Sequence, residues 1–206
     1  MWDQITEPAD PVHVEAVVEL ALDAQPRCGD TTVVAIDGRS GAGKTTLALG
    51  VAADLRSYGT TAIVHMDHLY PGWDGLGESS EILATRVLGA ISRASSAAYA
   101  QWNWEAGGWD GTVVLEPTDF LVIDGSGSSV GPARPYAAVG VFVDADPMLR
   151  MSRGLARDGD TYRPHWQRWA AQEDAIFAAD DTRANADLVI DTTGRGLRSA
   201  GWNQPT

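Results

Sequence analysis

The stretch IDGRSGAGKTT, residues 36–46, follows a short apolar run and precedes a segment of small and apolar residues. Within it, residues 38–45 match the phosphate-binding loop pattern GxxxxGK[ST] in full. The preceding TTVVAID, residues 31–37, is rich in β-branched residues and uncharged until its last residue, which is typical of a strand buried on both faces. After Lys44, apolar residues at helical spacing predict a helix. The stretch therefore predicts a strand, a glycine loop and a helix, the context in which this motif binds phosphate.

The residue types of the loop suit the triphosphate tail of a nucleotide. Glycine at positions 38, 41 and 43 permits positive φ, which turns successive N–H groups toward one phosphate, and the following helix directs its positive end to the same place. Lys44 offers a cation to the β- and γ-phosphates, and Thr45 offers a hydroxyl to Mg²⁺. The alternative is a glycine-rich turn with an incidental lysine. We expect the nucleotide to be bound by Gly38, Ser40, Gly41, Ala42, Gly43, Lys44, Thr45 and Thr46.

The alternation of strand and helix recurs along the chain. Further strands are predicted at 61–67, 119–125, 139–145 and 186–191. Helices are predicted at 12–24, at 79–94 with a cap at Ser79 or Ser80, after an N-cap at Asp146 with Pro147 at N1, and around 165–179. Strands interleaved with helices form parallel sheets, so we expect an α/β three-layer sandwich with about five parallel strands and helices on both faces.

One domain is expected to cover residues 1–206, because this length and an apolar fraction of 44% suit a single globular core. Residues 97–117 alternate polar and apolar residues around glycines, which predicts a small antiparallel insertion at the sheet edge. Residues 194–206 are expected to form a frayed tail.

The charge balance restricts the partners. Fifteen basic and 28 acidic residues give a net charge of -13, which disfavours nucleic acid as a partner. No window is apolar enough for a membrane span, and the N-terminal segment lacks the pattern of a secretory signal. With Cys28 as the single cysteine, these features predict a cytoplasmic protein that contacts no membrane. The sequence leaves the oligomeric state open.

Two carboxylates follow strands that would end beside the loop. Asp67 could accept the proton of a substrate hydroxyl as that hydroxyl attacks the γ-phosphate, which makes it the candidate base. A strand-end cap or a second metal ligand is the alternative for Asp67. Asp124 could reach Mg²⁺ directly or through water, and its alternative role is that of a turn aspartate before Gly125.

Arginines after the fourth strand predict a lid. Arg150, Arg153 and Arg157 are spaced by three and four, so they share one helix face. Beside the polar stretch DGDTYRPH, they suggest a lid at approximately 150–165 that closes over the transferring phosphate, with Arg163 as a fourth member. The alternative is a solvated basic face.

The motifs GRSGAGKTT, HMDHLY, FLVIDG and RGLARDG together resemble those of the P-loop kinases of the uridine kinase and phosphoribulokinase group, over roughly residues 33–191. The resemblance implies a P-loop NTPase fold that uses ATP and Mg²⁺ to phosphorylate a hydroxyl of a small molecule. It implies Asp67 as the base and Arg153 and Arg157 as nucleotide contacts. The family's strand-end acid is commonly a glutamate followed by glycine, where this chain has Asp124.

Aromatic and acidic residues in two segments, both expected near the carboxyl edge of the sheet, suggest the acceptor site. Aromatic faces suit a nucleobase and carboxylates suit ribose hydroxyls, which favours a uridine- or cytidine-like nucleoside over other hydroxylated metabolites. The alternative is a small satellite core under a long loop. The candidates are Tyr70, Trp73, Asp74, Trp102, Trp104, Glu105 and Trp109, with Arg134 for substrate or phosphate.

Glu173 falls inside an apolar stripe, four residues from both Trp169 and Phe177. Since an unpaired buried carboxylate would be costly, we expect Glu173 to pair with a lid or neighbouring arginine. His165 is expected at the surface, and His65 with His68 is not expected to form a metal pair. The competing function class is a regulatory NTPase that acts on a protein partner.

Overall fold

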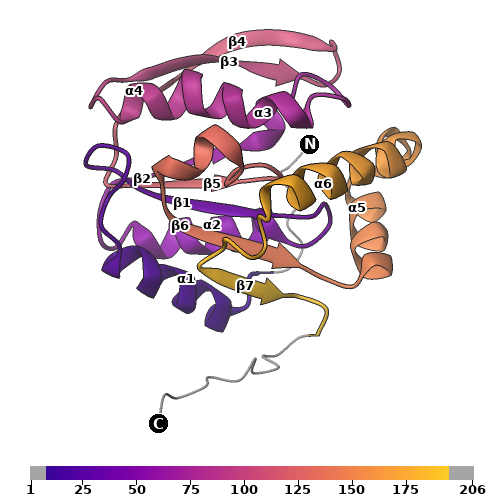
Figure 1. Cartoon of the computed structure of the whole chain (residues 1–206), viewed down its shortest axis with the longest axis horizontal. Helices are drawn as coiled ribbons and strands as arrows, with labels where there is room; N and C mark the ends of the chain where they lie inside the picture. Colours follow the sequence, from indigo (N-terminus) through magenta and orange to yellow (C-terminus); the bar gives the residue numbers. More distant parts are fainter. Residues whose placement is uncertain (1–7, 195–206) are drawn as a thin grey trace.

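The computed structural model describes residues 8–194 and has a five-stranded sheet at its centre (Figure 1). The strands lie in the order β2–β5–β1–β6–β7, and every neighbouring pair is parallel. The predicted α/β fold with five parallel strands is therefore confirmed. The strands are β1 (Thr32–Gly38), β2 (Thr61–His65), β5 (Phe120–Asp124), β6 (Ala137–Asp144) and β7 (Leu188–Asp191).

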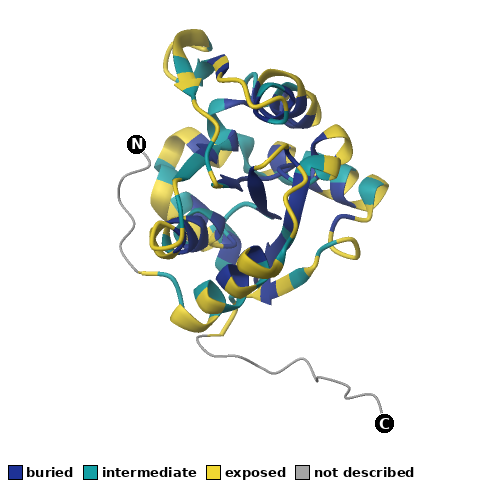
Figure 2. Cartoon of the chain, turned by 90° about the vertical axis from the view of Figure 1, so that its left-hand side faces the viewer, coloured by how far each residue is buried: buried dark blue, intermediate teal, exposed yellow. Residues whose placement is uncertain are grey.

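Helices cover both faces of this sheet. Since successive strand residues point to opposite faces, Val33 and Leu121 enter the core on one face, and their neighbours Val34 and Val122 enter the core on the other. The buried strands are dark blue between the helical layers in Figure 2. The first core contains residues of α3 (Leu76–Leu83), α5 (Pro147–Tyr162) and α6 (Trp166–Asp180), and the second contains residues of α1 (Pro11–Asp23) and α2 (Lys44–Leu55).

The predicted insertion is an antiparallel hairpin of β3 (Ala97–Asn103) and β4 (Gly108–Leu115). It forms a separate two-stranded sheet and is not hydrogen-bonded to the edge strand β2. The hairpin lies above α3 at the top of Figure 1, and β3 packs against a π-helical turn at Ala84–Leu88.

Two local predictions have different outcomes. Asp146 caps α5 as expected, because its carboxylate accepts hydrogen bonds from the next free N–H groups of the first turn. The cap at Ser79 or Ser80 is wrong: α3 begins three residues earlier, at Leu76, and both serines are buried inside it. Ser79 Oγ instead donates to the Leu76 carbonyl oxygen at 2.7 Å. A helical segment continues through the π-helical turn into α4 (Gly89–Ile91).

No helix within residues 8–194 combines the length and apolar character needed to cross a bilayer. The tail expected at 194–206 lies outside the described residues, except for Gly194.

Candidate active site

The loop between β1 and α2 forms a cradle at the carboxyl edge of the sheet. Gly43 caps α2 with φ 96°, and an ideal Cβ there would meet no other atom within 4 Å, so its outer side is open. Gly41 has φ 76°, and a Cβ there would lie 2.1 Å from the Arg150 carbonyl oxygen. The loop therefore requires glycine both for its backbone conformation and for its contact with α5. Residues Ser40–Thr46 line one wall of a cavity.

Lys44 is the only lysine in the 206-residue sequence, and it is buried beside this cradle. Its ammonium donates to the Arg39 carbonyl oxygen at 3.0 Å and lies 3.4 Å from Ser126 Oγ. Burial lowers the pKa of Lys44, and the carboxylate of Glu173 is the strongest of the charges that oppose this shift. A cation held here by surrounding carboxylates suits an incoming polyphosphate.

The predicted magnesium residues touch one another. Thr45 Oγ1 donates to Asp124 Oδ2 at 2.6 Å, and the other carboxylate oxygen of Asp124 is bonded to His65 Nδ1. This contact raises the pKa of His65, because the carboxylate favours the protonated ring. A hydroxyl and a carboxylate in the cavity that the phosphate loop lines are oxygen donors that fit Mg²⁺ with a bound phosphate.

Asp67 lies in a 3₁₀ turn, Met66–His68, directly after β2, so the strand ends two residues before it. Asp67 lines the cavity shared with the loop, and its backbone carbonyl oxygen accepts a 2.9 Å hydrogen bond from Trp104 Nε1 of the β3–β4 turn. Burial raises the pKa of Asp67 to about 6, and the Arg157 guanidinium opposes the shift. Asp67 is therefore mostly ionised at neutral pH.

The cavity has a volume of about 1400 Å³ and follows the carboxyl edge of the sheet. At the β7 side it is lined by His13 of α1 and by Ile190 and Thr192. The phosphate loop occupies the middle. The opposite part, which we name the acceptor end, is lined by Asp67, His68, Tyr70, Trp73, Trp102, Asn103, Trp104 and Glu105.

Trp73 is the centre of the aromatic cluster at the acceptor end. Its ring stacks on His165 at 4.3 Å and on Tyr162 at 5.3 Å between ring centroids, and it contacts Trp104 at 4.6 Å. His165, which was expected at the surface, is half-buried, and its ring stacks on Trp73. Much of the aromatic surface packs against itself, and its exposed edges line the cavity.

Three residues predicted for the substrate lie elsewhere. Asp74 is exposed, forms an ion pair with Arg168 of α6, and is not among the described residues that line the cavity. Arg134 is bound to Asp180 and donates to the Ser129 carbonyl oxygen at 3.1 Å, so it fastens the end of α6 and does not reach the cavity. Trp109 packs edge-on against Trp102, outside the cavity lining.

The four lid arginines do not act as one stripe. Arg153 and Arg157 line the cavity; Arg153 donates to Thr192 Oγ1 at 3.0 Å and Arg157 to Asp158 at 2.8 Å. Arg150 is buried and donates to the Ala145 carbonyl oxygen at 3.0 Å, which makes it an anchor for the start of α5. Arg163 is exposed and pairs with Asp160. Of the four arginines, Arg153 and Arg157 line the cavity and Arg150 and Arg163 do not, and the closing of a lid stays a prediction.

Within residues 8–194, the hydrogen bonds of Glu173 come from serine and tryptophan donors, where an arginine partner was expected. Its Oε1 accepts from both the backbone N–H and the hydroxyl of Ser40, each at 2.8 Å. Both donors of Ser40 are thus turned toward α6, although Ser40 also lines the cavity. The partners of Glu173 therefore include polar groups of the phosphate loop, and its charge acts on Lys44.

Two residues of the site went unnoticed in the sequence. Ser126 Oγ lies between Lys44, Gly38 and Glu173. Asp37 is fully buried at the end of β1, where it accepts from Gly38 N at 2.7 Å and Gly127 N at 2.9 Å. The serine-glycine run that follows FLVID was the available signal, since such a run provides many small donors after a strand end.

No family model and no curated protein sequence matches the chain. A solved structure from Bacillus stearothermophilus, assigned as a possible uridine kinase, aligns at 20% identity with a TM-score of 0.66 and covers 87% of this chain and 98% of that one. Another, from Silicibacter sp. TM1040, carries the provisional assignment of a fructose transport system kinase; it aligns at 20% identity with a TM-score of 0.53 and covers 86% and 98%. The chain therefore has a P-loop NTPase-like α/β fold, which it shares with these two structures.

Proposed function

We propose that the protein is an ATP- and Mg²⁺-dependent phosphotransferase that moves the γ-phosphoryl group to a hydroxyl of a small neutral molecule, with a nucleoside of the uridine or cytidine type favoured. One observation carries the proposal: a single cavity is lined by the phosphate loop, by the carboxylate of Asp67 and by the aromatic acceptor end. The shared fold with two structures assigned as kinases adds support.

In this proposal, Asp67 accepts the proton of the acceptor hydroxyl as that oxygen attacks the γ-phosphorus. Its pKa of about 6 leaves it ionised at neutral pH, yet basic enough to share the proton in the transition state. Lys44, Arg153 and Arg157 offset the charge that develops on the transferring group. Thr45 and Asp124 would hold Mg²⁺, which screens the β- and γ-phosphate oxygens when bound.

The charge of the acceptor end supports a neutral acceptor. Its described residues include two carboxylates, Asp67 and Glu105, and neither lysine nor arginine. Burial also lowers the pKa of His68, which favours the neutral form of its ring. A sugar phosphate or carboxylate would be repelled by these acids, whereas nucleosides and sugars carry no such charge.

The competing reading is a regulatory NTPase that acts on a protein partner. Such a protein needs a water molecule beside the γ-phosphate and has no use for a wall of four aromatic residues and a second acid, Glu105, in the same part of the cavity as Asp67. The extent of the acceptor end therefore favours transfer to a bound metabolite.

The test is ADP release from MgATP with matched acceptors: uridine and cytidine against their 5′-monophosphates, and free sugars against sugar phosphates. We expect a neutral member to raise turnover at least tenfold over the rate without acceptor, and its phosphorylated counterpart to raise it far less. If no small molecule raises turnover and a protein partner does, the regulatory reading replaces this one.

A further inference from the structure

Glu173 joins three parts of the site through one carboxylate oxygen. Its Oε1 accepts hydrogen bonds from Ser40 N, Ser40 Oγ and Ser126 Oγ, each at 2.8 Å, and from Trp169 Nε1 at 3.1 Å. These donors belong to the phosphate loop, the loop after β5 and the preceding turn of α6. Glu173 is only 1% exposed, so its charge depends on these groups instead of on water.

The buried carboxylate of Glu173 is unexpected beside a phosphate loop, because it repels the phosphate that the loop binds. The reason we find is geometric. With both donors of Ser40 directed to Glu173, and with Ala42 N donating to the Arg39 carbonyl oxygen at 3.1 Å, the backbone at the start of the loop is fixed before a phosphate binds. The carboxylate repels a bound phosphate to some extent, but it also orders the loop before the phosphate binds, and this preorganisation offsets the repulsion.

The same oxygen reaches Lys44 through one hydroxyl. Ser126 Oγ has a single hydrogen and lies 2.8 Å from Glu173 Oε1, 2.9 Å from the Gly38 carbonyl oxygen and 3.4 Å from Lys44 Nζ. A hydroxyl that donates to Glu173 keeps its lone pairs for the ammonium of Lys44. Glu173 therefore contacts the loop backbone directly at Ser40 and is linked to the ammonium of Lys44 through Ser126.

The fourth donor extends the network to the acceptor end. The ring of Trp169 packs edge-on against Tyr70 at 4.8 Å between centroids, and Tyr70 donates its hydroxyl hydrogen to the Ser126 carbonyl oxygen at 2.9 Å. The contacts close a circuit from Glu173 through Trp169, Tyr70 and Ser126 back to Glu173. Tyr70 lines the acceptor end, so the wall for the acceptor and the loop for the phosphate share one fixed point.

We propose that Glu173 is a positioning residue of the phosphate site, which fixes the Ser40 end of the loop and the ammonium of Lys44 and links both to the aromatic wall through Trp169. This role of Glu173 deepens the proposed function, and it rests on that function in one respect, namely that the loop binds a nucleotide.

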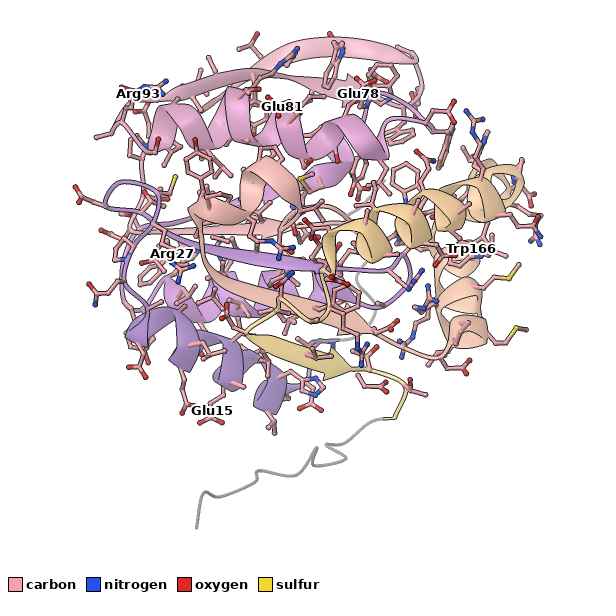
Figure 3. The ribbon with its side chains drawn as sticks, in the orientation of Figure 1. Glu15, Arg27, Glu78, Glu81, Arg93 and Trp166 are labelled. Carbon is pink, nitrogen blue, oxygen red and sulfur yellow. The ribbon has the colours of Figure 1, made fainter. Side chains whose placement is uncertain are left out.

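The test uses Glu173→Gln, which keeps the shape and removes the charge. Calorimetric titration with MgADP is expected to show a dissociation constant raised about tenfold, the size of a lost charged hydrogen bond. The matched control is Glu81→Gln, because Glu81 is exposed on α3 beside the hairpin and lines no described cavity (Figure 3). The control is expected to bind within twofold of the natural protein.

A second readout separates positioning from mere folding. Lys44 is the only lysine, so its titration can be followed by the pH dependence of its modification by an amine-reactive reagent. Loss of the carboxylate is expected to move the midpoint to lower pH, whereas a loosened fold raises the rate at every pH without moving the midpoint. An unchanged midpoint and an unchanged MgADP affinity in folded Glu173→Gln would overturn the proposal.

Two milder variants keep the proposal falsifiable if Glu173→Gln fails to fold. Trp169→Phe and Ser40→Ala each remove one donor and leave the carboxylate in place, and each is expected to weaken MgADP binding about threefold. If both bind MgADP as tightly as the natural protein, Glu173 does not position the loop. If the natural protein itself binds no MgADP, the proposed function fails, while the midpoint shift still reports on the contact between Glu173 and the loop.

Discussion

Thr45 Oγ1 donates a 2.6 Å hydrogen bond to Asp124 Oδ2, which joins the first turn of α2 to the end of β5. The sheet register explains the contact, because Asp124 pairs with Ile36 of β1, two residues before the phosphate loop begins, and with His65 of β2. Parallel strands thus bring a hydroxyl and a carboxylate, 79 residues apart in sequence, to the edge where the cradle opens.

Removing either member of this pair is expected to weaken the use of Mg²⁺. Asp124→Asn should lower turnover at least 100-fold and raise the Mg²⁺ concentration for half-maximal rate about tenfold, because the metal loses a charged ligand. Thr45→Ser should remain close to the natural protein, since it keeps the hydroxyl. Mg²⁺ titrations of ADP release measure both, with exposed Asp30→Asn as the control. Equal Mg²⁺ curves for Asp124→Asn and Asp30→Asn would contradict the assignment.

Lys44 offers a direct report on nucleotide binding, because it is the only primary amine besides the α-amino group. Burial lowers its pKa, so amine-reactive reagents should modify it below the pH at which a free lysine reacts. MgATP is expected to slow this modification at least fivefold, as measured by mass spectrometry of the intact chain. Lys44→Arg should be labelled only at the α-amino group. A labelling rate that millimolar MgATP leaves unchanged would show that nucleotide does not reach the loop.

Asp67 is expected to control the pH dependence of the reaction. Its pKa is about 6, so turnover should rise with pH between 5 and 7 as the carboxylate ionises. A profile that is flat over this range, measured with saturating MgATP and acceptor, argues against Asp67 as the base.

The same shift has a consequence for stability. The pKa of Asp67 is higher in the folded state than in the unfolded state. The contribution of Asp67 to the free energy of unfolding is therefore fully present below about pH 4 and is lost as the pH rises through about 6. Asp67→Asn should therefore be more stable than the natural protein at pH 8 by about 1–3 kcal/mol, with a smaller gain at pH 5. Urea unfolding at the two pH values measures the difference, and a loss of stability at pH 8 would contradict it.

Arg134 is expected to matter for stability and not for binding. Its guanidinium fastens Asp180 and the Ser129 carbonyl oxygen in a partly buried setting. Arg134→Ala should lower the free energy of unfolding by about 1–3 kcal/mol, because it removes the cation that pairs with Asp180 and the donor to the Ser129 carbonyl oxygen. The dissociation constant of MgATP should stay within twofold. If Arg134→Ala loses MgATP affinity while its stability is unchanged, Arg134 belongs to the binding site.

The fold followed from the sequence because its signals are local. The β-branched run before Gly38, the apolar stripe after Lys44 and the cap at Asp146 each depend on residues a few positions apart. Asp67 could be placed near the loop because the carboxyl ends of parallel strands meet at one edge. The position of Asp67 in the cavity agrees with that expectation, and its role as the base stays a prediction.

The errors arose where partners are distant in sequence. Glu173 contacts Ser40 across 133 residues, and Asp74 contacts Arg168 across 94. A charged residue on a helix or loop can meet many such partners, and no periodicity selects one of them. The aromatic residues were recognised, but the stacking of His165 on Trp73 depends on how the segment after α5 packs against the turn before α3. Figure 3 shows Trp166 where α5 and α6 meet, at the start of this arrangement.

The central claim, a γ-phosphoryl group delivered past Asp67 to a bound hydroxyl, is tested most directly by transfer of label from [γ-³²P]ATP to the best acceptor of the matched panel. For Asp67→Asn we expect a dissociation constant for MgATP within twofold of the natural protein and a rate of labelled product at least about 1,000-fold lower. Labelled product formed by Asp67→Asn at a rate close to that of the natural protein would contradict the claim.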